Sequence, residues 1–362
     1  MLHAHKQSTL APIASRGTAV PRKRWFPLLL ALVVLALPAA AQATTFGAEV
    51  NGDFVGQAGG YVSAGQVASN LQALYAAGGQ LGRADSNWAA TEPKAPRRGR
   101  HTYLWSYDDM IMSEMAQARL SWQPDLVFAP RWAEVHRSRI IHVANGTFVA
   151  YLPPANNGNF AAYATAFMRR YGPHGAFWRS HRTLPYKPVT SVEVWNEPDN
   201  KHDWGNDINL QDYVKMYEAV RTAVHRVDRG ARVVTGGLAW TPSSLPRLLK
   251  ALRGKPADAI AVHPYAATPK QTIAIARNAQ ALLRRYGRGR TPMVINEYGW
   301  TSETNTWGST APGNVDRYVY QALIGLAKLH PAEIAPFQWG TPTWGLSDGT
   351  FARALHFIRT HK

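Results

Sequence analysis

Residues 189–236 read VTSVEVWNEPDNKHDWGNDINLQDYVKMYEAVRTAVHRVDRGARVVTG. The stretch contains two short apolar runs, 189–195 and 232–236. Between them, apolar side chains recur with the three-and-four spacing of an amphipathic helix, at Tyr213, Met216, Tyr217, Val220 and Val224. Asn209 is a predicted N-cap of this helix, and Gly230 is its predicted end. A strand, a helix and a second strand in this order predict parallel pairing through a right-handed crossover.

The same alternation recurs over the rest of the chain. Eight runs are predicted strands, at residues 46–50, 80–85, 126–129, 189–195, 232–236, 259–262, 292–295 and 334–338. Continuous apolar runs fit strands that are covered on both faces, as in a parallel sheet. Eight strand–helix units close into a (β/α)8 TIM barrel, which is the predicted α/β fold, as a single domain. The alternative is an open doubly wound sheet, but no glycine-rich phosphate loop follows the first run.

The first 43 residues have the composition of a secretory signal peptide. They contain five basic residues and no acidic residue, and the cluster at 22–24 precedes an apolar stretch at 25–37. Ala41-Gln42-Ala43 supplies the small residues of a cleavage site, so we expect residues 1–43 to be removed and residues 44–362 to be secreted. The apolar stretch is shorter than the roughly 20 residues that span a bilayer, which makes an uncleaved anchor the lesser alternative.

Composition excludes several classes of protein. The 362-residue chain has no cysteine, which excludes disulfide frameworks, thiolate metal sites and cysteine nucleophiles. The formal net charge is +17, of which five charges lie in residues 1–43 and +12 remains on residues 44–362. A nucleic acid or an anionic surface would suit this charge, but the basic residues are scattered. Because Arg97-Arg98-Gly99-Arg100 is the one dense cluster, we expect no nucleic-acid partner; a functional role of the cluster would favour an acidic glycan.

Two predicted strands run directly into a glutamate. VEVWNEP at 192–198 carries Glu197, and MVINEYG at 293–299 carries Glu297. In a TIM barrel the reactive groups lie where strands enter the following loops. Pro198 disfavours helical backbone at Glu197, so we expect an extended chain there. Two carboxyl groups facing each other across a barrel mouth are the arrangement used in glycoside hydrolysis, where one is protonated and the other is ionised.

WNEP at 195–198 and INEYG at 295–299 resemble the paired signature of retaining glycoside hydrolases of clan A, whose catalytic domain is a (β/α)8 barrel. The resemblance implies that Glu197 is the general acid/base and Glu297 the nucleophile of a double displacement. It also implies an oligo- or polysaccharide substrate and a reaction that needs no metal ion and no organic cofactor.

Segments outside the two motifs narrow the resemblance. GPHGAFW at 172–178 and LPY at 184–186 are similar to sequences upstream of the acid/base in family 39. APRW at 129–132 departs from family 5, whose members have a histidine after the third strand. A family 39-like member or an unclassified relative therefore fits better than a family 5 member.

Further positions match residues with supporting roles in the clan. Arg83 corresponds to the arginine of the second strand that keeps the nucleophile ionised. His263 and Tyr265 resemble a His-x-Tyr motif, in which the tyrosine donates to the nucleophile and the histidine lies near the acid/base or the substrate. Asn196 is expected to bind the 2-hydroxyl group of the sugar.

Aromatic side chains predict a carbohydrate groove on the loop side of the barrel. Nine tryptophans fall at or just after predicted strand ends, namely Trp88, Trp105, Trp132, Trp204, Trp240, Trp300, Trp307, Trp339 and Trp344. We expect Trp88, Trp132 and Trp339 to contact substrate, and Trp339 resembles the clan's tryptophan beneath the sugar at the scissile bond. Asn145-Gly146 lies between two apolar runs and predicts a hairpin that forms one wall of the groove.

Two other functions fit the same pattern. A non-catalytic polysaccharide-binding barrel would also present aromatic rings, although it would have no use for both glutamates. A transglycosidase would differ from a hydrolase only in the acceptor that reaches the intermediate. The sequence does not indicate the sugar, the linkage or the oligomeric state.

Overall fold

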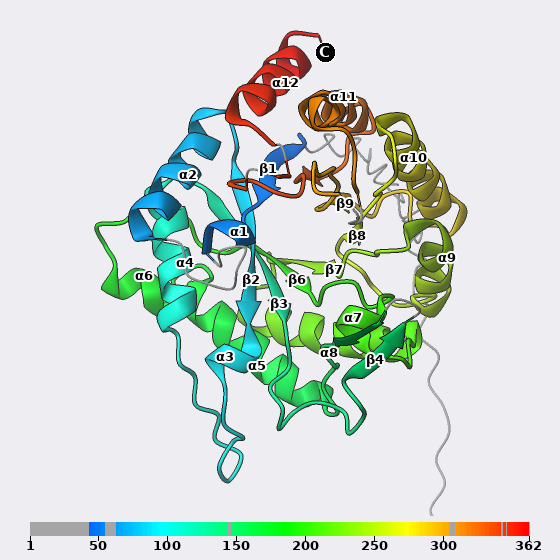
Figure 1. Ribbon diagram of the computed structural model, residues 1–362. Helices are drawn as coiled ribbons and strands as arrows, with labels where there is room; N and C mark the ends of the chain where they lie inside the picture. The colour runs from blue at the N-terminus through cyan, green and yellow to red at the C-terminus, as the bar shows by residue number, and fades with distance from the viewer. Residues whose placement is uncertain are drawn as a thin grey trace, which may run out of the picture. The chain divides into compact units, whose positions relative to one another are not determined.

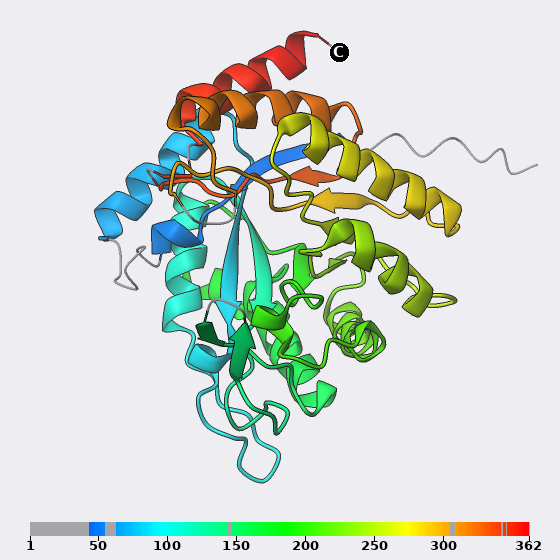
Figure 2. The ribbon, with the colours of Figure 1, turned by 45° about the vertical axis from the view of Figure 1, so that its right-hand side comes forward.

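Parallel strands surround a common axis, with helices on the outside (Figures 1 and 2). The strands of this sheet are β1 (Thr45–Glu49), β2 (Leu81–Asn87), β3 (Ser121–Val127), β6 (Ser191–Val194), β7 (Arg232–Thr235), β8 (Ile260–Val262), β9 (Met293–Ile295) and β10 (Glu333–Ile334). Their order is β7-β6-β3-β2-β1-β10-β9-β8, with every neighbouring pair parallel. Val234 pairs with Ala259 and so brings the two ends together. The predicted (β/α)8 barrel is confirmed.

The computed structural model describes residues 43–54, 63–143, 146–304, 308–341, 343–344 and 346–361. The predicted signal peptide, residues 1–43, lies outside these ranges except for its last residue. The chain from Gln42 onward forms one compact unit. Among the described residues, no helix combines the length and the apolar character that crossing a membrane requires.

Helices connect successive strands along the chain. Their bounds are α1 (Asn51–Phe54), α2 (Ala64–Ala76), α3 (Trp88–Thr91), α4 (Ser106–Gln117), α5 (Asn157–Tyr171), α6 (Ala176–Ser180), α7 (Lys201–Trp204), α8 (Leu210–Val227), α9 (Thr241–Ala251), α10 (Pro269–Arg285), the 3-10 turn η1 (Pro312–Asn314), α11 (Val315–Ala327) and α12 (Asp348–Thr360). The antiparallel strands β4 (Ile140–Val143) and β5 (Gly146–Val149) form the predicted hairpin, whose turn residue Asn145 lies outside the described residues.

Two strands differ from their predicted bounds by more than two residues at one end. Strand β3 begins at Ser121 rather than at residue 126. The prediction missed its first half because that half contains polar residues and Pro124, which are not typical of a central strand. Strand β10 ends at Ile334, four residues before its predicted end, although the chain beyond it continues to bind both neighbours. Its Phe337 amide donates to Tyr298, and its Trp339 amide donates to Glu49.

Helix α8 begins as the sequence predicts and ends slightly earlier. The side chain of Asn209, the predicted N-cap, accepts a hydrogen bond from the Gln211 amide at 2.9 Å. The helix stops at Val227 rather than at Gly230, because Asp228 already has extended backbone with φ of −141°.

Two tyrosines on the buried face of α8 bind the strands beneath it. The Tyr213 hydroxyl donates to the Val194 carbonyl (3.0 Å) and accepts from the Gly236 amide (2.6 Å). The Tyr217 hydroxyl donates to the Val233 carbonyl (2.8 Å). Tyr213 therefore joins the end of β6 to the segment after β7, and so stabilises the rim of the barrel from which WNEP begins.

We expect Tyr213→Phe to lower the free energy of unfolding by about 1–3 kcal/mol, because two buried backbone groups lose their partner. Urea denaturation measures the difference. Tyr75→Phe, at a position that is 45% exposed, is the matched control and should change the free energy by less than about 0.5 kcal/mol. Equal stability of the two variants would contradict the bridging role of the Tyr213 hydroxyl.

Candidate active site

Arg83, on β2, binds carboxylates from three other parts of the barrel. Its Nε donates to Glu193 on β6 at 2.7 Å, and its Nη2 donates to Asp125 on β3 at 2.9 Å. Its Nη1 donates to Glu297, just beyond β9, at 2.7 Å. The side chain is 1% exposed, so these charges attract each other with little screening by water. Arg83 thus holds Glu297 in place and is also part of a buried ion network.

Negative groups outnumber this one cation inside the barrel. Burial and the charge of Glu297 raise the pKa of Glu49 on β1, although Arg83 lowers it. Burial and the charge of Glu193 likewise raise the pKa of Asp125. Some of these carboxyl groups therefore keep their proton at pH values at which a carboxyl group in water is ionised.

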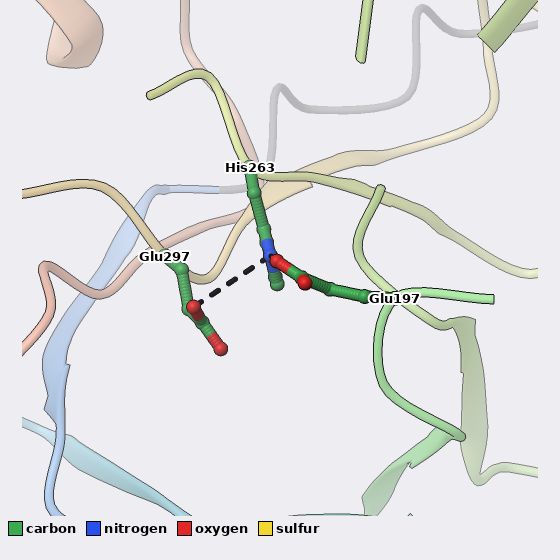
Figure 3. Close-up of side chains that lie close together, drawn as sticks. All are labelled: Glu197, His263 and Glu297. Carbon is green, nitrogen blue, oxygen red and sulfur yellow. Dashed lines mark hydrogen bonds and ion pairs between the residues drawn. The ribbon is translucent and has the colours of Figure 1, made fainter. Parts of the chain in front are cut away.

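Glu197 and Glu297 point toward each other across the barrel mouth, and His263 lies between them (Figure 3). One carboxylate oxygen of each glutamate and one ring nitrogen of His263 lie within 4.8 Å of one another. Carboxyl groups in retaining glycosidases are about 5–5.5 Å apart, and those in inverting enzymes about 6.5–9.5 Å. The separation here fits the shorter class. In the described part of the chain this is also the one cluster of His, Asp and Glu side chains that is close enough to hold a metal ion.

The backbone at Glu197 differs from the extended chain that Pro198 predicts. Glu197 has φ of 39° and Trp195 has φ of 68°, both in the left-handed region. Such conformations cost about 1–3 kcal/mol each and persist only where contacts hold them. Trp195 donates its indole N–H to the Asp203 carbonyl (2.6 Å), and Asn200 donates its side-chain amide to Glu197 Oε2 (2.6 Å). The expectation was wrong because these tertiary contacts outweigh the local preference of the residue before proline.

His263 links the two glutamates electrostatically. Its Nδ1 is 2.9 Å from Glu197 Oε1 and 3.6 Å from Glu297 Oε2. Burial alone would lower the pKa of His263, but the charges of Glu297 and Glu197 raise it. Burial alone would raise the pKa of Glu197, but the hydrogen bond and charge of His263 lower it. These opposite shifts favour the charged pair, with the proton on the imidazole and the Glu197 carboxylate ionised.

Two further predicted site residues lie against the same groups. The Tyr265 hydroxyl donates to Glu297 Oε2 at 3.0 Å. Asn196 Oδ1 accepts from Arg83 Nη2 at 3.1 Å, which connects the residue before Glu197 to the ion network. The structure thus brings together all six polar residues expected at the site: Arg83, Asn196, Glu197, His263, Tyr265 and Glu297.

Trp339 does not have the position that the sequence suggested. Its side chain is 3% exposed, donates its indole N–H to the Asn70 carbonyl in α2 (2.8 Å) and packs edge-on against Phe351 of α12. The ring therefore fills the space between the barrel and its helices. It offers no face to a sugar, and the expectation of a substrate platform at Trp339 is corrected.

Trp88 is likewise part of the core. It is completely buried, stacks on Tyr163 and donates to Glu92 at 2.8 Å, so it cannot contact a substrate. Trp132 packs edge-on against Trp88 and is only partly buried, which leaves part of its ring accessible. The other six of the nine tryptophans at predicted strand ends are buried (Trp204, Trp300), partly buried (Trp105, Trp344), exposed (Trp240) or outside the described residues (Trp307).

A cavity of about 650 Å³ opens beside Tyr265. The loops after β7, β8 and β9 form its walls, with Trp240, Ala266 and Gly299 among the lining residues. Tyr265 lines this cavity and also donates to Glu297, so one residue connects the cavity with the glutamate pair.

Three buried acids of the site carry no expectation from the sequence analysis: Glu49, Asp125 and Glu193. Glu193 binds Arg83 with one oxygen and accepts from the Gly237 amide with the other (2.9 Å). The sequence contains a pattern that could have indicated Glu193: it is an acid inside an apolar strand, in Val192-Glu193-Val194. Such a side chain is buried in the barrel and needs a buried partner.

Solved structures resemble the chain although their sequences differ widely from it. One is a GH39 beta-xylosidase from Caulobacter crescentus, with 15% identity and a TM-score of 0.61 over 89% of this chain and 72% of that chain. Another is the GH39 enzyme from Xanthomonas axonopodis pv. citri, with 15% identity and a TM-score of 0.62 over 89% of this chain and 67% of that chain. A third is the endoglucanase Cel5A from Thermotoga maritima, with 11% identity and a TM-score of 0.58 over 86% of this chain and 96% of that chain. The chain has the barrel fold of clan A glycoside hydrolases. At these identities the likeness concerns the fold alone. No protein-family model matches the sequence, and no curated protein matches it.

We expect Arg83→Met to destabilise the protein by about 3–5 kcal/mol near neutral pH, because it leaves buried carboxylates without their cation. Without Arg83, the pKa values of Glu49 and Asp125 rise further, so the folded state binds more protons than the unfolded state. Stability of the variant should therefore increase as the pH falls from 8 to 5, and the deficit should shrink.

Denaturation at several pH values measures this change. Arg98→Met, in an exposed loop, is the control and should follow the wild type throughout. A deficit for Arg83→Met that stays constant with pH would argue that packing, rather than charge, explains the loss.

Proposed function

We propose that this protein is an exported retaining glycoside hydrolase that cleaves O-glycosidic bonds by double displacement. The observation that carries the proposal is the separation of Glu197 and Glu297, whose carboxylate oxygens lie within 4.8 Å of each other at the barrel mouth. Export rests on the basic, apolar and small-residue pattern of residues 1–43. The glycosidase fold of the solved structures supports the activity.

In the first step Glu297 attacks the anomeric carbon, and the bond to the leaving oxygen breaks as that oxygen takes a proton. Arg83 and Tyr265 bind one oxygen each of Glu297, so they hold the nucleophile against rotation and fix its direction of attack. Asn196 already accepts from Arg83 through its oxygen, which leaves its amide N–H groups to donate to a sugar hydroxyl.

The proton for the leaving group comes from the pair of Glu197 and His263. Glu197 takes the Nδ1 proton of His263 along their 2.9 Å hydrogen bond and passes a proton to the leaving oxygen. The charge of Glu297 is one cause of the raised pKa of His263, and this charge disappears when Glu297 becomes an ester. Nucleophilic attack therefore makes the imidazolium more acidic as the leaving group needs its proton.

In the second step water attacks the anomeric carbon of the glycosyl-enzyme and releases Glu297 as a carboxylate. Glu197, now in its basic form, accepts the proton of the water and returns it to His263 Nδ1, which regenerates the free enzyme. The released sugar keeps the anomeric configuration of the substrate, because two displacements have taken place. A sugar hydroxyl in place of water would give transglycosylation by the same route.

We expect Glu297→Ala to abolish turnover and to leave folding intact, because no glycosyl-enzyme can form. Glu197→Ala should still react with aryl glycosides that have good leaving groups, and added azide should restore its turnover, with a glycosyl azide as product. Product analysis by NMR and steady-state rates measure both effects. Unchanged hydrolysis by Glu297→Ala would overturn the proposal, whereas sugar binding without turnover by the wild type would favour a polysaccharide-binding barrel.

We expect His263→Ala to move the alkaline limb of kcat/KM to lower pH. With His263 present, the pair keeps its proton up to a pKa above the ordinary histidine value of 6.5. A lone Glu197 is expected to lose its proton closer to the carboxyl range, because burial raises its pKa but Asn200 and Arg83 still lower it. A shift of about one pH unit or more is expected on an aryl glycoside. His142→Ala, in the exposed hairpin, should leave the profile unchanged, and an unchanged limb in His263→Ala would exclude the paired proton donor.

A further inference from the structure

Trp240 is the tryptophan most open to solvent in the part of the chain that the structure describes. It is 54% exposed, on the segment between β7 and α9, and it lines the cavity of about 650 Å³ beside Tyr265. A large ring exposed in this way has unfavourable contact with water, which a ligand lying against it would remove. Among the described residues, the exposed Tyr75 on the outer helix α2 lines no such cavity. The cavities beside the exposed Tyr186 and Tyr286 do not include Tyr265, which binds Glu297.

The segment that carries Trp240 is held by the loop that carries Glu197. Asp199, two residues after Glu197, is 3% exposed and accepts the amide N–H groups of Ala239 (3.0 Å) and Trp240 (2.9 Å). Bonds to a buried carboxylate are among the stronger hydrogen bonds of a protein. The backbone from which the indole projects is therefore held against the loop of Glu197 before any ligand binds.

The other walls of the cavity are held with equal firmness. Trp300, which is 1% exposed, donates its indole N–H to the Ala266 carbonyl (2.8 Å) and so fixes the loop after β8. Thr301 and Ser309 form a bridge in the loop after β9, next to the lining residue Gly308. A cavity with fixed walls and an exposed ring pays little conformational entropy when a rigid ring binds in it.

We propose that Trp240 and this cavity bind the sugar unit on the leaving-group side of the scissile bond, and that the substrate is an oligo- or polysaccharide that continues beyond that bond. This inference rests on the proposed function. Glu197 must lie beside the leaving oxygen that it protonates, and Asp199 holds Trp240 on the side of Glu197. The apolar face of a pyranose ring fits the flat indole, whereas a small alcohol as leaving group would leave the ring uncovered.

The test compares two kinds of substrate, one with a sugar and one with a fluoride ion as the leaving group. The probes are the β-xylosyl and β-glucosyl fluorides and the xylo- and cello-oligosaccharides of two to six units. In Trp240→Ala, kcat/KM should fall at least about tenfold more on an oligosaccharide than on the fluoride of the same sugar, because fluoride places no sugar in the cavity. Trp240→Phe should retain most of the activity, and Tyr75→Ala should equal the wild type on both substrates. Equal losses of Trp240→Ala on the two substrates would overturn the proposal.

A binding measurement separates this proposal from the proposed function. Calorimetric titration of Glu297→Ala with the same oligosaccharides should give an affinity that drops at least about tenfold when Trp240→Ala is added. An unchanged affinity, or no binding of any oligosaccharide, would overturn the role of Trp240. A wild type that hydrolyses neither fluorides nor oligosaccharides, yet binds the latter through Trp240, would overturn the hydrolase alone.

Discussion

One buried guanidinium has to satisfy several buried acids, and the remainder of the site depends on how it does so. Arg83 contacts carboxylates from three other parts of the barrel wall, and each contact uses a different nitrogen. The planar group allows only one orientation that serves all of them. Any strand that shifted its register would withdraw its acid from this arrangement, so the ion network couples the pairing of the barrel to the position of Glu297.

The network also explains why the interior of this barrel is polar near its mouth. A TIM barrel is usually filled by branched apolar side chains, whereas here Glu49, Asp125 and Glu193 lie among them. Burial raises the pKa values of Glu49 and Asp125, which keeps the total negative charge near Glu297 below what the residue count suggests. Arg83 binds Glu193 and Glu297 at the same distance of 2.7 Å, and of these two acids Glu297 lies beyond its strand, at the rim.

The fold and the polar site were largely predictable from the sequence because both depend on short-range patterns. WNEP and INEYG lie directly after apolar strands, and strand ends in a barrel meet at one mouth. The failures concern features that only tertiary contacts determine. Trp339 follows a strand end in sequence, yet its ring packs against α12, since direction of a side chain is not readable from its position in the chain. The left-handed backbone of Glu197 depends on Asn200 and on the indole of Trp195.

His263 owes its position to a glycine that the sequence pattern does not single out. A Cβ atom at residue 237 would lie 2.0 Å from His263 Nε2, so only glycine leaves room for the imidazole. The amide of the same Gly237 donates to Glu193, which binds Arg83. This one residue thus connects the ion network that orients Glu297 with the histidine that faces Glu197.

The residues that bind the two glutamates and the ring of Trp240 consequently differ in how far a substitution would disturb the barrel. Residues that hold the glutamates are tied to several strands, so a substitution there disturbs the barrel as well as the chemistry. Trp240 contributes only its backbone to the scaffold, through the amide that Asp199 accepts, and its ring lies free at the rim. Replacement of that ring can alter which sugars bind while Asp199 keeps the loop in place. The proposed sugar contact of Trp240 is therefore structurally separate from the buried charges around Arg83.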